Sequence, residues 1–324
     1  MAPAPPAFTV ALLGTQGAGK STLCGHTLHK CGAVGKAALV DNEQAAFEFG
    51  CEDNKWRLLS DTTRVERERG TTLLTHAHKL ATNTRLYTLL DLPTHCNLGK
   101  PAIAGVGSAD GAALVVSAVP AELKESTTPD SVALREQIGL LYAFGIRQLV
   151  VVVNKMDHPQ VSWSEEKFTE AKNEISVLLK KYFNPEKLQI IPASGLTGDN
   201  VQLKSGNMTW WKGASFVEAL QAFTVPDRAV DKPLRLCVER LAGGGGGSAD
   251  SVVAIGQVAA GGVQAGAGVR VFPGGFAARV ASIQCHGEDR AAASAGDYVG
   301  LCLEGVQGRV HAGCMVVGEG EGGP

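Results

Sequence analysis

The sequence predicts an α/β fold with a mainly parallel sheet, followed by a small antiparallel β-barrel. Between about residues 7 and 225, short apolar runs alternate with helical stretches, which is typical of a parallel sheet covered by helices on both faces. From Pro233 onward, short strands rich in valine and leucine are punctuated by glycine, as in small barrels. A chain of 324 residues is long enough for each part to have its own core.

The first part is expected to contain five buried strands and at least three helices. The strands are apolar runs rich in β-formers, at 8–13, 86–91, 112–118, 148–153 and 188–192. The helices are expected at 20–31, 131–144 and 164–182. Ser164 is the expected cap of the last helix, because the helix formers Glu165, Glu166 and Lys167 follow it.

The chain is expected to divide at a linker over residues 224–228, which contains Pro226. We expect a first domain over 7–225, a β-barrel domain over 226–318, and disordered ends over 1–6 and 319–324.

Composition excludes several classes of protein. Hydrophobic residues make up 44% and charged residues 19%, as in a globular chain. No apolar stretch reaches membrane-spanning length, and the start has no charged-then-apolar signal pattern, so we expect no membrane association. The eight cysteines are scattered without a C-x-x-C pair, which favours reduced thiols and a cytoplasmic location. The net charge of −2 argues against a protein that grips nucleic acid mainly through phosphates, and no DNA binding is expected.

The segment from Gly14 to Ser21 fits the phosphate-binding pattern G-x-x-x-x-G-K-[ST]. It lies between an expected buried strand and an expected helix, which is the context that this P-loop needs. Glycines let backbone N–H groups face phosphates, and the helix N-terminus adds partial positive charge. Lys20 would reach the β- and γ-phosphates, and Ser21 would bind Mg²⁺. The residues expected to contact the phosphates are Gly14, Gly17, Ala18, Gly19, Lys20, Ser21 and Thr22.

The motif Asn154-Lys155-Met156-Asp157, directly after the run Leu149–Val153, makes the expected nucleotide a guanine nucleotide. The Asp157 carboxylate can accept two hydrogen bonds from guanine, whereas adenine would leave it unpaired. Polar sites of this kind discriminate by about 10⁴-fold or more. Lys155 is expected to lie along the base, and Asn154 to tie the loop to its neighbours.

Three further segments follow the order that a GTPase needs. Thr72, after Arg67–Gly70, could present its hydroxyl to Mg²⁺ and its backbone to the γ-phosphate. Asp91 follows an expected strand, where a water-mediated Mg²⁺ contact belongs. The base pocket would be completed by a backbone N–H from the loop Ser194, Gly195 and Leu196.

These segments together resemble the translational GTPases related to eukaryotic elongation factor 1-alpha. The resemblance covers nearly the whole chain and is carried by the P-loop, Glu66–Gly70, Asp91–His95, Asn154–Asp157, Ser194–Asn200 and Trp210–Gly213. Two parts of the chain look closer to the ribosome-rescue (Hbs-type) and release-factor GTPases. One is Asn154–Trp163, and the other is Asp231–Val238 together with Ala295–Val299 and Gly313–Met315. The resemblance implies GTP and GDP with Mg²⁺ as ligands. It implies His95 as the residue that orients the attacking water, with Lys20 and Thr72 also serving catalysis.

Departures from the family pattern predict slow hydrolysis. The family has glycine where this chain has Thr94, and that glycine lets the peptide swing toward the γ-phosphate. Gln16 and Thr71 replace apolar residues around the catalytic histidine, and Gly17 replaces an aspartate. Losing a positioned catalytic contact costs about 2.7–4 kcal/mol, or about 10²–10³ in rate. Gly99 and Pro101 are expected to interrupt the helix that follows His95.

The resemblance leaves two functions open. The first is a translational GTPase, monomeric and active in elongation or in ribosome rescue and termination, with the ribosome and tRNA or a tRNA-mimicking protein as partners. Relatives have a third domain, which this chain does not contain, so full delivery of aminoacyl-tRNA is not expected. The second is a hydrolysis-impaired GTP-binding paralogue that acts as a binding or regulatory module. A P-loop kinase would leave the Asn154–Asp157 motif unexplained.

Overall fold

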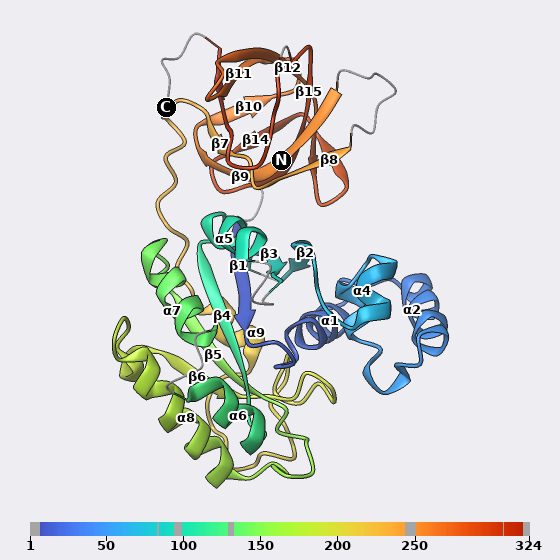
Figure 1. Ribbon diagram of the computed structural model, residues 1–324, viewed down its shortest axis with the longest axis vertical. Helices are drawn as coiled ribbons and strands as arrows, with labels where there is room; N and C mark the ends of the chain where they lie inside the picture. The colour runs from blue at the N-terminus through green and yellow to red at the C-terminus, as the bar shows by residue number, and fades with distance from the viewer. Residues whose placement is uncertain are drawn as a thin grey trace. The chain divides into compact units, whose positions relative to one another are not determined.

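The computed structural model describes residues 7–82, 84–93, 99–128, 133–243, 251–306 and 308–319 (Figure 1). The chain divides into two compact units. One consists mainly of Val10–Val106 and Asp110–Thr224, and the other mainly of the chain from Val225 onward. The domain bounds expected from the sequence stay a prediction.

The first unit is built on a six-stranded sheet with the strand order β2-β3-β1-β4-β5-β6. Its strands are β1 (Ala7–Gly14), β2 (His76–Ala81), β3 (Leu86–Asp91), β4 (Gly111–Ser117), β5 (Leu149–Asn154) and β6 (Gln189–Pro192). The pairs β1–β4, β4–β5 and β5–β6 are parallel, and β2–β3 is antiparallel. Every residue of β4 and β5 is buried, as expected for strands covered on both faces. The α/β prediction is confirmed, and the five predicted strands correspond to β1, β3, β4, β5 and β6.

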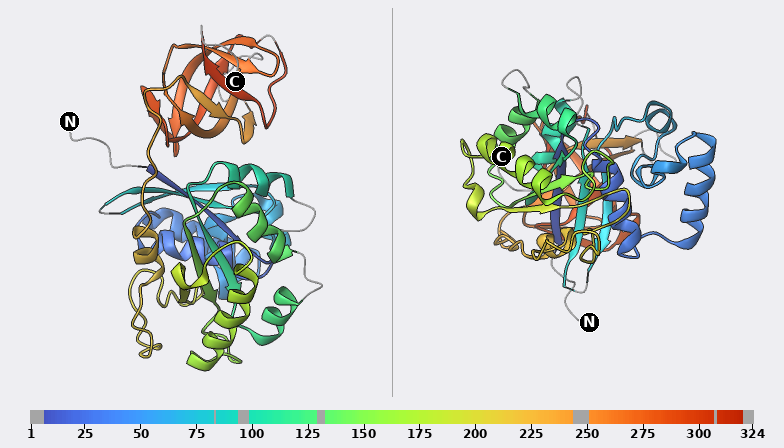
Figure 2. Two further views of the ribbon diagram at one scale, coloured as in Figure 1. Left: turned by 90° about the vertical axis from the view of Figure 1, so that its left-hand side faces the viewer. Right: turned by 90° about the horizontal axis from the view of Figure 1, so that it is seen from below.

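Helices cover both faces of this sheet (Figure 2). The longer ones are α1 (Lys20–Lys30), α2 (Lys36–Glu48), α5 (Gly99–Gly107), α6 (Pro120–Thr127), α7 (Ala133–Ala143) and α8 (Glu165–Leu179). The short ones are η1 (Glu52–Asn54), α3 (Arg57–Ser60), α4 (Arg64–Arg69), η3 (Pro185–Lys187) and α9 (Phe216–Gln221). Ser164 caps α8 as predicted, because its side chain accepts from the Lys167 N–H.

The segment between α1 and β2 is helical, which the sequence did not indicate. α2 buries only Asn42 and Ala46, so its sequence has little amphipathic signal. α4 begins with a capping box in which Thr63 and Glu66 satisfy each other's backbone N–H groups. α3 packs on α1, so this segment lies beside the P-loop helix.

The expectation that Gly99 and Pro101 interrupt a helix is wrong. Both residues belong to α5, which runs from Gly99 to Gly107. Pro101 lies in the first turn, where a backbone N–H has no partner within the helix and its absence costs nothing.

The second unit is an antiparallel β-barrel, which confirms the second half of the fold prediction. Six strands pair in the order β11-β16-β7-β9-β15-β12, and β12 pairs back to β11 to close the ring. The strands of the unit are β7 (Arg235–Cys237), β8 (Arg240–Gly243), β9 (Ser251–Ala260), β10 (Gly262–Gln264), β11 (Gly268–Phe272), β12 (Phe276–Cys285), β13 (Glu288–Arg290), β14 (Ala292–Ser294), β15 (Tyr298–Glu304) and β16 (Met315–Gly318). Small aliphatic side chains such as Leu236, Ala254 and Leu301 fill its core.

Two chemical properties of the described residues bear on function. None of the helices that the structure describes combines the length and apolar character that a membrane crossing needs. The cysteines within the described ranges are free thiols.

Candidate nucleotide-binding site

The P-loop connects β1 to α1, and its first residue, Gly14, is fixed by neighbouring elements. A Cβ on Gly14 would lie 1.9 Å from the Val115 carbonyl oxygen, and φ of Gly14 is +141°, so only glycine fits this position. The side chain of Gln137 on α7 accepts from the Gly14 N–H at 2.7 Å and donates to the Gly14 carbonyl at 3.3 Å. The first residue of the loop is thus fixed by contacts from β4 and α7.

Lys20 is buried under the loop and turned onto its carbonyls. Its Nζ donates to the carbonyl oxygens of Gly14 at 3.1 Å and Thr15 at 2.8 Å. Burial lowers the pKa of Lys20 to about 8, although the nearby Asp91 and Asp61 act to raise it. An anionic oxygen within the loop would be a stronger partner for this ammonium group than the two neutral carbonyls.

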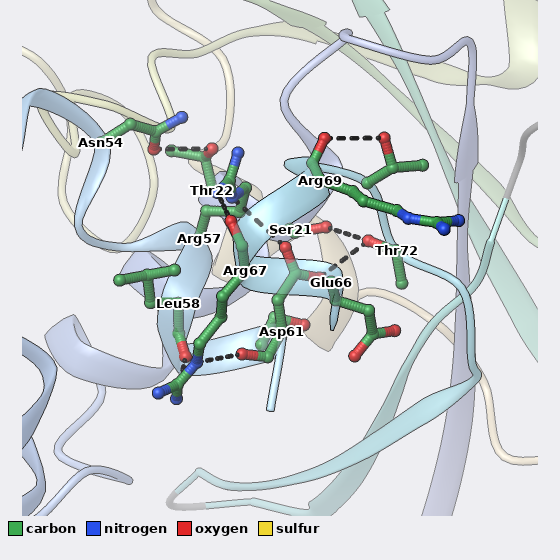
Figure 3. Close-up of polar contacts among 12 residues, drawn as sticks. Ser21, Thr22, Asn54, Arg57, Leu58, Asp61, Glu66, Arg67, Arg69 and Thr72 are labelled. Atoms are coloured by element: carbon green, nitrogen blue, oxygen red, sulfur yellow. Dashed lines mark hydrogen bonds and ion pairs between the residues drawn. The ribbon is translucent and has the colours of Figure 1, made fainter. Parts of the chain in front are cut away.

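A chain of hydroxyl and carboxyl groups begins at Ser21 (Figure 3). The hydroxyls of Ser21 and Thr72 lie 2.9 Å apart, and Thr72 Oγ1 donates to Asp61 Oδ1 at 2.9 Å. The predicted Mg²⁺ residues Ser21 and Thr72 therefore meet. Asp61 is an additional member that no sequence motif marked, since only the packing of the helical segment brings it here.

Asp91, the third predicted Mg²⁺ residue, lies at the end of β3. Ser60 Oγ donates to Asp91 Oδ2 at 2.5 Å. Asp61 and Asp91 are fully buried, and Asp61 Oδ2 and Asp91 Oδ1 have no hydrogen-bond partner among the described residues. Burial, and then the charge of Asp91, raise the pKa of Asp61 to about 6.

These oxygen groups fit Mg²⁺ together with a phosphate chain. Mg²⁺ prefers oxygen ligands and keeps several waters, so it needs few protein atoms. Ser21 and Thr72 offer hydroxyls, and the buried carboxylates of Asp61 and Asp91 offer unsatisfied acceptors for its waters. Within the part of the chain that the structure describes, no group of three or more His, Cys, Asp or Glu side chains could hold a metal without such help.

Asn154 joins the P-loop to the predicted base-binding loop. Its Nδ2 donates to the Ala18 carbonyl at 2.8 Å, and its Oδ1 accepts from the Gly195 N–H at 2.8 Å. A Cβ on Gly19 would lie 2.5 Å from the same Nδ2, so a residue with a side chain at position 19 would displace the Asn154 amide.

Asp157 is half-buried and oriented by Ser194. Ser194 Oγ donates to Asp157 Oδ1 at 2.5 Å and accepts from the Thr197 N–H at 3.1 Å. Lys155 has φ of +65°, and its Nζ pairs with Glu122 at 2.7 Å. The structure therefore brings Asn154, Asp157 and the Ser194–Leu196 loop together, as the predicted base pocket requires.

Trp56 and His26 also contact the Ser194–Leu196 loop. The sequence did not suggest these contacts. Trp56 Nε1 donates to the Leu196 carbonyl at 3.1 Å, and His26 Nδ1 lies 2.8 Å from the Gly195 carbonyl oxygen. The two rings stack with centroids 4.2 Å apart. Burial lowers the pKa of His26, which favours the neutral ring.

Thr94 and the predicted catalytic His95 lie outside the described residues. The hydroxyl of Thr22 donates to Asn54 Oδ1 at 2.9 Å, and its contact with phosphate stays a prediction.

Comparison with known proteins gives a family for this arrangement. Residues 6–236 match the model of the elongation factor Tu GTP-binding domain. The chain is 34% identical over 300 residues to elongation factor 1-alpha 1 of Euplotes crassus, covering 92% of this chain and 67% of that protein. It is 35% identical over 300 residues to elongation factor 1-alpha of Tetrahymena pyriformis, covering 92% and 68%. The chain thus spans about two thirds of the length of these two relatives.

A solved structure is similar over nearly the whole chain. The GTPase-like domain of S. cerevisiae Ski7, bound to GTP, superposes with a TM-score of 0.83 at 17% identity. The match covers 98% of this chain and 76% of that one. At this identity the likeness concerns the fold alone.

Proposed function

Because the chain belongs to the translational GTPases that share the elongation factor Tu GTP-binding domain, we propose that it binds GTP with Mg²⁺ and hydrolyses it to GDP as a conformational switch. The switch would act in translation elongation or in ribosome rescue and termination. Its partners would be the ribosome and tRNA or a tRNA-mimicking protein, and its location the cytoplasm.

One observation carries the proposal. Asn154 bonds both to the phosphate loop at Ala18 and to the loop that orients Asp157 through Ser194. A phosphate-binding loop and a carboxylate suited to guanine are thereby tied into one unit. This arrangement fits a guanosine nucleotide better than an adenosine nucleotide, which would leave the Asp157 carboxylate without base donors.

The chemistry assigned to this chain is the attack of water on the γ-phosphorus of GTP. The bond from that phosphorus to the β,γ-bridging oxygen breaks, and GDP and inorganic phosphate leave. His95 would orient the water, and Lys20 would stabilise the charge that develops on the phosphates. Ser21 and Thr72 would hold Mg²⁺, which supplies charge neutralisation at the β- and γ-phosphates.

A second candidate is a GTP-binding module that hydrolyses the nucleotide poorly. The threonine at position 94 and the polar, exposed Gln16 beside the phosphate cavity favour it. Both candidate functions require the same bound nucleotide and differ only in the rate of GTP hydrolysis.

A single-turnover assay with γ-labelled GTP, with and without ribosomes, separates these two functions. Ribosome-stimulated release of phosphate is the expected result for the switch. Tight retention of GTP without stimulation would support the module. Calorimetry with GTP and ATP under the same conditions tests the shared premise, and equal binding of ATP, or binding of neither, would contradict both functions.

A further inference from the structure

Arg57 lies at the phosphate cavity, although no recognised motif contains it. The cavity has a volume of about 150 Å³ and is lined by P-loop residues, by Gly70–Thr72 and by Arg57. Arg57 is the first residue of α3, and its side chain is 20% exposed. Its neighbour Trp56 is fixed by the hydrogen bond to Leu196, so the backbone that carries Arg57 is anchored beside the base-binding loop.

The guanidinium of Arg57 is poorly satisfied by its protein partners. Nη2 donates to the Arg67 carbonyl across 3.3 Å, and Nε lies 3.3 Å from Asp61 Oδ2 without forming a hydrogen bond (Figure 3). A guanidinium has five N–H donors, so most of its capacity is unused by the described residues. The guanidinium also lies close to Gly70, because a Cβ built on Gly70 would lie 2.8 Å from Arg57 Nη1.

The described residues that line the cavity include two cations and no acidic side chain, and the nearby carboxylates are those of Asp61 and Asp91. Lys20 lies on the P-loop side and Arg57 on the side of Gly70–Thr72. Asp61 is the acidic partner of Arg57, and it also accepts from Thr72. Arginine presents paired donors that match phosphate oxygens, and such charge-assisted bonds are stronger than the one to the Arg67 carbonyl.

We propose that Arg57 is a nucleotide-contacting residue whose guanidinium donates to the terminal phosphate of bound GTP. This inference rests on the proposed GTP binding. The terminal phosphate is assigned because Arg57 shares the cavity wall with Thr71 and Thr72, at the end of the site where Thr72 would meet the γ-phosphate. An arginine supplied by the same chain can raise GTP hydrolysis by about 10³-fold or more, since it neutralises charge that develops on the phosphates.

The test compares binding of GTPγS and GDP, each with Mg²⁺, to the wild type, Arg57→Ala and Arg57→Lys. Loss of a charged hydrogen bond to the γ-phosphate should weaken GTPγS binding about 10- to 100-fold in Arg57→Ala. GDP binding should change less than about threefold, because GDP has no γ-phosphate, and Arg57→Lys should fall between. Arg64→Ala is the matched control, since Arg64 lies on α4 with its side chain 79% exposed.

Two results would overturn the assignment. Unchanged GTPγS binding in Arg57→Ala means that the side chain does not touch the nucleotide. An equal loss for GTPγS and GDP means that Arg57 only supports the site through Asp61 and Arg67. If Arg57→Ala does not fold, judged by thermal unfolding without nucleotide, Arg57→Gln takes its place, because its shorter side chain fills part of the space and carries an uncharged N–H donor.

Failure of the proposed function looks different from failure of this inference. If the wild type binds neither GTPγS nor GDP, the proposed function is wrong and the assignment of Arg57 falls with it. If the wild type binds GTPγS and GDP, but Arg57→Ala weakens both equally or neither, only the assignment of Arg57 is wrong. The proposed function then stands. A further readout is binding of GDP with aluminium fluoride, which places negative charge at the γ-position and should depend on Arg57 as GTPγS does.

Discussion

Thr72 Oγ1 and Asp61 Oδ1 lie 2.9 Å apart, joined by a hydrogen bond that the Thr72 hydroxyl donates. The contact links Thr72, a predicted Mg²⁺ ligand, with a carboxyl group that is fully buried. Burial and Asp91 raise the pKa of Asp61 to about 6, although Arg57 acts to lower it, so the ionised form of Asp61 is costly even beside that guanidinium.

The stability of the nucleotide-free protein should therefore fall as the pH rises through 6. The pKa of Asp61 is 3.8 in the unfolded chain and about 6 in the folded one. A raised folded pKa gives stability that is complete below about pH 4 and is lost between pH 4 and pH 6, by about 3 kcal/mol. Urea unfolding at several pH values measures this loss.

Asp61→Asn is the variant that isolates this effect. It should remove this part of the pH dependence and be more stable than the wild type above pH 6. Lys20 titrates above the window, with a pKa of about 8. Glu66 acts in the opposite direction, because its pKa is lowered from 4.5 to about 2, and its contribution is nearly complete above about pH 4.5. The same slope in the wild type and in Asp61→Asn between pH 4 and pH 6 would show that Asp61 is not the group responsible.

Asp157→Asn should lower the preference for guanine. The amide offers a donor where guanine needs acceptors, so GTP binding should weaken by about 100-fold or more, while xanthosine triphosphate should gain. Fluorescence competition with GTP, ATP and xanthosine triphosphate measures the change. Glu170→Gln on α8 is a control with the same change of charge at a 58% exposed side chain, and an identical effect there would refute the role of Asp157.

Thr94→Gly should raise the rate of GTP hydrolysis. If the threonine blocks the peptide from turning toward the γ-phosphate, glycine at position 94 should restore about 10²-fold in single-turnover rate. His95→Ala in the same background should abolish the gain, because the restored peptide would have no histidine to orient the water. An unchanged rate in Thr94→Gly would place the defect elsewhere, with Gln16 as the next candidate.

The sequence predicted those parts of the fold that depend on local pattern. The strand over 86–91 coincides with β3, and the helix over 164–182 corresponds to α8 with its Ser164 cap. In such segments the apolar period and the cap lie within a few residues of each other, so no distant contact is needed to recognise them.

Other parts depended on packing that no short pattern encodes. α2 has a largely exposed surface, and Gly99 and Pro101, which lie in the first turn of α5, suggested a break in the helix. Arg57 reaches the phosphate cavity, and Asp61 reaches Thr72, because α3 packs on α1. The motif residues of the site could be named in advance for the opposite reason, since Lys20, Asn154 and Asp157 each belong to a short string with its own chemistry.

The stacking of Trp56 on the rings of His26 and His29 gives the molecule an optical reporter of its own. The ring centroids are 4.2 and 4.6 Å apart, and the indole N–H is bonded to Leu196. The remaining tryptophans, at positions 163, 210 and 211, are grouped elsewhere, where Trp210 bonds to Trp163 and packs on Trp211. Light emitted by Trp56 should therefore sense the predicted base-binding loop, and a change in its intensity would report on that loop without any attached dye.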